Sequence, residues 1–141
     1  MKSSDEFFMK HALREAEKAF NKDEVPIGAV AVYEGKIIGR AHNIRETTQD
    51  PLGHAEILLL KKVSKKLKSW RLNGVTIYVT LEPCLMCMGA LLQVRIDRLV
   101  FGATAPNSGV GDHQIEVSTD VLAADSKKLL KHFFQILRKP K

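Results

Sequence analysis

Two short motifs, H-A-E at positions 54–56 and P-C-L-M-C at positions 83–87, place the strongest constraint on how this chain can fold. The second motif holds both cysteines of the chain. Zinc is bound by neutral imidazole and thiolate ligands in a tetrahedron, and a catalytic zinc keeps one position open for water. His54, Cys84 and Cys87 supply three such ligands, and no further cysteine exists to close the site. The fold must therefore bring the two motifs together, with the glutamate of the first motif beside an open metal site.

Three other interpretations of these residues compete with a catalytic metal site. Cys84 and Cys87 could form a redox dithiol, because such motifs also follow a strand and open a helix. They could be half of a structural zinc site completed by a distant histidine, or buried cysteines that act as small apolar residues. A redox pair leaves the H-A-E motif unexplained, and a structural zinc site leaves Glu56 unexplained. We therefore favour zinc held by His54, Cys84 and Cys87, with Glu56 as the proton carrier.

Length and composition predict one cytoplasmic domain. The 141 residues, 45% hydrophobic and 27% charged, suit a single globular domain over residues 1–141. No apolar run approaches the length that spans a membrane, and the first residues lack the apolar segment of a signal peptide. We therefore expect a cytoplasmic protein with reduced thiols and no membrane partner. The formal net charge of +6 permits a polyanionic partner such as RNA but does not require one.

The apolar pattern predicts helices and strands in alternation. Helical spacing predicts helices over 3–20, 54–67, 83–92 with Pro83 in the first turn, and from 119 onward. Apolar and β-branched runs predict strands at 27–32, 36–41, 75–81, 98–102 and 114–117. Polar stretches rich in turn residues predict loops at 42–53 and 103–112. This order predicts an α/β fold with three layers, α/β/α, around a mixed sheet of roughly five strands.

Helix geometry restricts where the motif residues can lie. His54 and Glu56 are two residues apart, so they reach one metal only from the first turn of a helix, where the helix dipole also favours a carboxylate. Cys84 and Cys87 share a face of the following helix because they are three residues apart. That helix is apolar on most sides and must be buried all round. We expect a second subunit to supply part of this burial, which predicts a homodimer.

The predicted site suits hydrolysis of an amine from a ring carbon. Zinc lowers the pKa of bound water toward neutrality, and hydroxide would attack an amidine-type carbon such as that of adenine or cytosine. Glu56 would move the water's proton to the ring nitrogen and then to the leaving amine. Glu82 either ends its strand with its backbone near the substrate or, less favoured, carries a second proton. Asn43 either binds the base through its amide or satisfies its own backbone in a turn, and the pattern leaves this open.

The chain resembles the bacterial tRNA-specific adenosine deaminase family, and H-x-E … P-C-x-x-C is the general signature of zinc-dependent base deaminases. The matching residues are E-V-P-I-G-A-V at 24–30, Asn43, D-P at 50–51, H-A-E at 54–56, Y-V-T-L-E-P-C at 78–84, M-C at 86–87, G-A at 89–90, R-I at 95–96, V-F-G-A at 100–103 and F-F at 133–134. The resemblance implies a cytidine-deaminase-like fold, a homodimer with zinc in each subunit, and conversion of the wobble adenosine in a tRNA anticodon loop to inosine. It also implies that Asn43 and the backbone at Val25 and Ala55 line the base pocket. The basic end of the last helix would lie near the anticodon loop.

One region departs from the family pattern. Ala105 and Asn107 stand where the family usually has an aspartate and a lysine, and the loop at 109–112 is shorter. Because that region helps to grip RNA in the family, a second hypothesis is a deaminase of the same fold that acts on a free base, a nucleoside of the guanine or cytosine type, or single-stranded DNA. A third is a zinc-stabilised but catalytically silent RNA-binding module, which an intact Glu56 disfavours.

Overall fold

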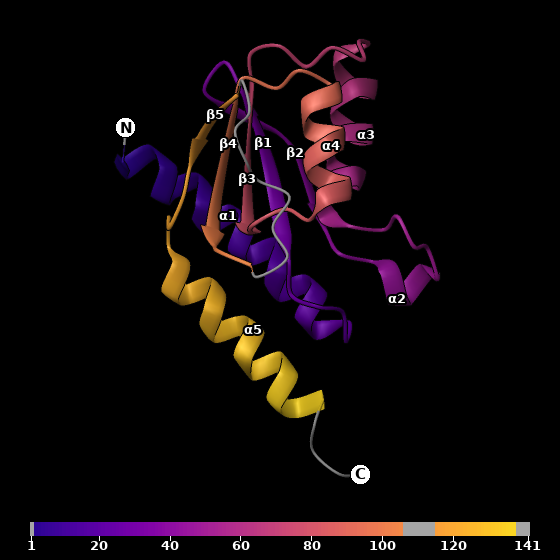
Figure 1. Ribbon diagram of the computed structural model, residues 1–141, viewed down its shortest axis with the longest axis vertical. Helices are drawn as coiled ribbons and strands as arrows, with labels where there is room; N and C mark the ends of the chain where they lie inside the picture. Colours follow the sequence, from indigo (N-terminus) through magenta and orange to yellow (C-terminus); the bar gives the residue numbers. More distant parts are fainter. Residues whose placement is uncertain (1, 106–114, 138–141) are drawn as a thin grey trace.

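The computed structural model describes residues 2–105 and 115–137 (Figure 1). The elements are, in chain order, α1 (Lys2–Asn21), β1 (Gly28–Tyr33), β2 (Lys36–His42), α2 (Arg45–Thr48), α3 (Ala55–Leu67), β3 (Val75–Leu81), α4 (Leu85–Gln93), β4 (Arg98–Ala103), β5 (Glu116–Ser118) and α5 (Ala123–Leu137). Among these helices, none has the length and apolarity needed to cross a membrane.

The strands form one mixed five-stranded sheet in the order β2-β1-β3-β4-β5. β1 runs antiparallel to β2 and β3, whereas β4 runs parallel to β3 and β5. In Figure 1, α3 and α4 lie on one face of the sheet and α1 and α5 on the other. This confirms the predicted three-layer α/β/α architecture. Because β1 and β3 are antiparallel, the start of β1 lies beside the end of β3, where α4 begins.

Alternate residues of the strands face the two helix layers, as the pleat of a strand requires. Ala29 and Ala31 of β1 belong to the core beneath α3 and α4. Val30 and Val32 belong to the core beneath α1, with Met9 of that helix. The nearly continuous apolar run of β1 thus reflects a central strand that is buried on both faces.

α1 packs very closely against the start of β1. A Cβ atom at Gly28 would lie 2.2 Å from the carbonyl oxygen of Ala12 and 2.3 Å from the amide nitrogen of Ala16. Interiors are close-packed and cannot absorb such overlaps, so only glycine allows this approach. The contact fixes the start of β1, which directly follows the segment 25–27.

The predicted loop at 42–53 contains the short helix α2, so that prediction was wrong over these residues. The Glu24 carboxylate accepts hydrogen bonds from the backbone N–H groups of Glu46 and Thr47. Such groups at the start of a helix have no partner within the helix. Because Glu24 is distant in the sequence, no local pattern marks α2.

The last strand and helix begin later than predicted. β5 begins at Glu116, and Gln114 in the predicted strand at 114–117 lies outside the described residues. α5 begins at Ala123 rather than at 119. The backbone N–H of Asp120 donates to a carbonyl of β4, which holds the preceding segment in a turn.

An ion pair buried beneath α1 anchors this helix to the sheet. Arg98 of β4 donates two hydrogen bonds to the Asp5 carboxylate, of 2.8 and 2.7 Å, and the Tyr78 hydroxyl donates a third of 2.8 Å. Asp5 is only 6% exposed. The hydrogen bonds from Arg98 lower the pKa of Asp5 in spite of its burial.

Replacing Arg98 by methionine should lower the free energy of unfolding by about 3 kcal/mol at pH 7, because it leaves a buried carboxylate unpaired. The folded-state pKa of Asp5 lies below its unfolded value of about 3.9, so the pair stabilises the fold fully above that value. This stabilisation is lost as the pH falls through the folded-state pKa. The difference in free energy of unfolding between the variant and the unmodified protein should therefore shrink at acid pH. Urea unfolding of both proteins at neutral and acid pH measures this. A difference in free energy of unfolding that does not change with pH would contradict this account. Tyr78→Phe, which removes one neutral donor, should lower the free energy of unfolding by only about 1 kcal/mol.

Candidate functional site

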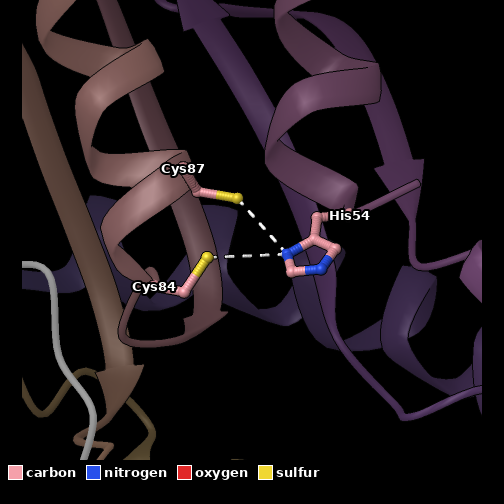
Figure 2. Close-up of side chains that lie close together, drawn as sticks. All are labelled: His54, Cys84 and Cys87. Atoms are coloured by element: carbon pink, nitrogen blue, oxygen red, sulfur yellow. Dashed lines mark hydrogen bonds between the residues drawn. The ribbon is translucent and has the colours of Figure 1, made fainter. Parts of the chain in front are cut away.

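The two sequence motifs meet where the N-termini of α3 and α4 converge. His54 immediately precedes α3 and Cys84 immediately precedes α4, so Pro83 lies before the helix and not in its first turn as predicted. Neither the His54 nor the Cys84 side chain caps its own helix. Figure 2 shows these two side chains and that of Cys87 pointing toward one another from the two helices.

The distances between these side chains fit a tetrahedral metal ion. Nδ1 of His54 lies 3.7 Å from Sγ of Cys84 and 3.5 Å from Sγ of Cys87 (Figure 2). A tetrahedral zinc, with Zn–N of about 2.0 Å and Zn–S of about 2.3 Å, holds its nitrogen and sulfur ligands about 3.5 Å apart. All three ligand atoms lie within 4.8 Å of one another, and no other group of three such side chains occurs in the part of the chain that the structure describes. These residues could therefore hold a metal ion with one position left for water.

Burial controls the protonation of the candidate ligands. Desolvation, helped by the positive charge of Arg45, lowers the pKa of His54 and favours the neutral imidazole that binds metals. Desolvation raises the pKa of the Cys87 thiol, and the neighbouring Glu56 raises it further. A bound cation would reverse this shift, because a coordinating thiol is deprotonated.

Glu56 lies in the first turn of α3, against Cys87. It is 4% exposed, and desolvation raises its pKa to about 7 although its own backbone N–H and Cys87 hydrogen-bond to it. A carboxyl group with a pKa near neutrality can both accept and release a proton at physiological pH. Its position beside the candidate metal ligands suits the predicted proton transfer.

A cavity of about 150 Å³ opens beside His54, and neither cysteine nor Glu56 is among its lining residues. It is lined by Val25, Ile27, Asn43, Arg45, His54 and Ala55. The structure thus brings together Val25, Asn43 and Ala55, the residues that the family resemblance assigned to a base pocket.

Asn43 makes the contacts of a turn residue and also lines the cavity. Its Oδ1 accepts from the N–H of Arg45 at 3.4 Å, as in a turn, and its Nδ2 donates to the carbonyl of Val25 at 3.5 Å. Both distances exceed those of strong hydrogen bonds. Since Asn43 also lines the cavity, its amide can exchange these weak contacts for bonds to a ring.

Glu82 is not among the residues that line this cavity. Its Oε1 accepts from the N–H of Ala105 at 2.9 Å, and its own N–H donates to the carbonyl of Ala103. These bonds tie the end of β3 to the last residue of β4 and to the chain just after it, in keeping with a strand-ending residue. A role of Glu82 toward a substrate stays a prediction.

Several predicted features lie outside the described residues. They are Asn107, the shortened loop at 109–112 and the basic end of the last helix at 138–141.

Sequence reasoning did not assign Arg45, Ile27 or Glu24 to the site. Arg45 and Ile27 line the cavity, and Glu24 holds α2 beside it. The available signal was position: the polar stretch that contains Arg45 leads directly to His54.

The fold and the two motifs are those of a deaminase. In agreement, residues 3–138 match the MafB19-like deaminase family. The chain is 47% identical to the tRNA-specific adenosine deaminase of Bacillus subtilis (strain 168), over 99% of this chain and 94% of that protein. It therefore belongs to the tRNA-specific adenosine deaminase family, as the resemblance predicted.

Solved structures agree with this assignment. One comes from a study of A-to-I editing by tRNA:A34 deaminases at the wobble position of transfer RNA. It has a TM-score of 0.83 and 38% identity over 88% of this chain and 99% of that one. A guanine deaminase from Nitrosomonas europaea has a TM-score of 0.81 over 91% of this chain and 83% of that one, but only 22% identity. That second similarity shows the fold alone.

Proposed function

We propose that this protein is a zinc-dependent hydrolase that deaminates the wobble adenosine of a tRNA anticodon loop to inosine. The observation that carries the proposal is the arrangement of three residues, His54, Cys84 and Cys87, beside the buried Glu56 at a small cavity. The relative at 47% identity, a tRNA-specific adenosine deaminase, and the structure at 38% identity, from the study of tRNA:A34 deaminases, support adenosine as the base.

The residues of the chain divide the chemistry among them. Zinc bound by His54, Cys84 and Cys87 would supply activated water near neutral pH. The Glu56 carboxylate takes one proton of the water to the ring nitrogen, where it stays, and then takes the remaining proton of the added hydroxyl to the leaving amine. As the carbon–oxygen bond forms and the carbon–nitrogen bond breaks, ammonia leaves and a carbonyl remains.

The cavity walls hold the base during this exchange. The Asn43 amide binds the edge of the ring, because it can both donate and accept hydrogen bonds. The backbone at Val25 and Ala55 lines the same cavity. An anticodon loop suits such a site because its unpaired bases can be splayed out of the stack.

A substrate panel tests this function against its runner-up. The zinc-loaded protein is incubated with an anticodon stem-loop that carries adenosine at the wobble position, the same loop with cytidine there, free guanine and free cytosine. Nucleoside mass analysis should find inosine from the first RNA and no product from the others. Turnover of cytidine or of a free base, without inosine, would replace the proposed substrate with the runner-up.

We also propose a homodimer that covers the outer side of α4. Within one chain the helix is only partly buried, since Leu85 is 78% exposed and Met86 36% exposed. Apolar side chains so close together on one helix favour an interface with a second copy. Because the site needs free thiols, we propose a reducing compartment, the cytoplasm, for this dimer.

Replacing Leu85 by glutamate should convert the dimer to a monomer, because it buries a charge in the proposed interface. Sedimentation equilibrium should then report the mass of one chain at concentrations where the unmodified protein has twice that mass. Ile136→Glu is the matched control, since Ile136 is also exposed (48%) but lies on α5, across the sheet. An unmodified protein that sediments as a monomer, or a dimer that survives Leu85→Glu, would contradict the proposal.

A further inference from the structure

Arg45 is a cation at the rim of the cavity that the proposed chemistry leaves without a role. It lines the cavity, and its side chain is exposed. Ligand pockets that enclose a whole drug-sized molecule have volumes of about 300 Å³ or more, whereas this cavity has about 150 Å³. A base can enter such a cavity, but the sugar and the phosphates attached to it must stay at the rim, beside Arg45.

The backbone of Arg45 is held against the site. Its N–H donates to Oδ1 of Asn43, and the N–H of Ile44 donates to the carbonyl of Gly53 at 2.9 Å. A Cβ atom at Gly53 would lie only 3.1 Å from the Cα of Arg45. The two ends of the segment 43–53 are therefore pressed together, with Arg45 next to the residue that precedes His54.

Glu24 fixes the helix that begins at Arg45. Glu24 is 0% exposed, and its carboxylate accepts from the N–H groups of Glu46 and Thr47 and from the Thr47 hydroxyl. Burial opposes its ionisation, but the bonds from Thr47 and Glu46, together with the positive charge of Arg45, lower the pKa of Glu24 overall. A fully buried carboxylate that holds a surface helix indicates that the position of this helix matters.

The guanidinium group of Arg45 is free to bind an anion. Among the described residues, no hydrogen bond or ion pair involves its side chain. Its positive charge nevertheless reaches the site, because it contributes, after burial, to the lowered pKa of His54.

We propose that Arg45 binds a backbone phosphate of the RNA strand next to the base in the cavity, with Glu24 as the residue that positions it. The inference rests on the proposed function and deepens it, because a phosphate contact at the rim selects a polynucleotide over a free base or nucleoside. Guanidinium groups suit this task, since they bind phosphate through paired hydrogen bonds.

Salt-dependent RNA binding tests the proposal independently of turnover. A labelled anticodon stem-loop is titrated with zinc-loaded protein at several salt concentrations, with Glu56→Gln present in every protein to prevent conversion. Adding Arg45→Gln should weaken binding about tenfold and reduce the slope of log K against log salt by about 0.7, the value for one phosphate on a single strand. Arg71→Gln is the control, because Arg71 is also exposed but precedes β3, at the end of the sheet away from the cavity. Equal slopes for Arg45→Gln and the unmodified arginine would overturn the proposal.

A neutral linkage identifies the phosphate. Stem-loops with a methylphosphonate on the 5′ or the 3′ side of the wobble adenosine are titrated in the same way. The unmodified arginine protein should bind one of these stem-loops as weakly as the Arg45→Gln protein binds the natural RNA. Arg45→Gln should not weaken the binding of that stem-loop any further. Glu24→Gln should reduce the same coupling, because it loosens α2. Fully additive losses with both linkages would contradict the contact.

The failure of this inference and that of the proposed function are distinguishable. A parallel assay asks whether the protein without substitutions makes inosine from the same stem-loop. Absence of inosine there counts against the proposed function, whereas an unchanged salt slope for Arg45→Gln counts against the phosphate contact alone.

Discussion

Replacing Glu56 by glutamine should abolish inosine formation while leaving zinc bound. Glutamine has nearly the shape of glutamate but cannot take up and release the proton that the reaction moves. General acid–base catalysis contributes about 10²–10⁴-fold to rates, so we expect the turnover rate to fall by at least about 10³-fold. The metal should remain because His54, Cys84 and Cys87 are unchanged.

Two measurements on the same preparation test this expectation: inosine by nucleoside mass analysis and zinc by elemental analysis. Glu34→Gln is the matched control, since Glu34 is exposed in the turn that follows β1, at the end of the sheet away from the cavity. It should keep both zinc and activity. Near-normal turnover in Glu56→Gln would remove Glu56 from the mechanism, and loss of zinc would make it a ligand.

Replacing Cys87 by alanine should remove both zinc and activity. Cys87 is fully buried and provides one of the three candidate ligand atoms, and a histidine with one thiolate holds zinc poorly. Changes in the residues that merely support zinc ligands lower the affinity about 10–100-fold, so the loss of a ligand should cost more than about 100-fold.

Zinc content after dialysis and a competition titration with a chelator measure this loss. Met88→Leu is the control, because Met88 is the next residue of α4, equally buried, and the exchange conserves volume. It should retain zinc and activity. Full zinc content in Cys87→Ala would show that this thiol is not a ligand.

The sequence predicted the sheet and the meeting of the two motifs because both leave local signals. The β-branched run at 75–81 and the apolar run at 27–32 match β3 and β1 to within one residue. The spacing of Cys84 and Cys87, and the need for His54 to lie at a helix start, follow from helix geometry alone.

The remaining features depend on contacts between distant segments. α2 exists because Glu24 accepts hydrogen bonds from its first turn, and that contact joins separate parts of the chain. The sequence predicted that one chain leaves part of α4 uncovered, but it did not predict that Leu85 lies on the exposed side, because an apolar helix has no marked polar face. Asn43, Val25 and Ala55 were assigned to the pocket only through the family resemblance, because their own residue types are common in turns and cores.

The origin of the oxygen in the product tests the central claim most directly. A wobble-adenosine stem-loop is incubated with the zinc-loaded protein in ¹⁸O-labelled water, and the product nucleosides are separated and weighed. Hydrolytic deamination predicts inosine with one ¹⁸O atom at the carbon that carried the amine, and none when Glu56→Gln replaces the unmodified protein. Adenosine that stays unchanged under these conditions, or inosine without the label, would contradict the account.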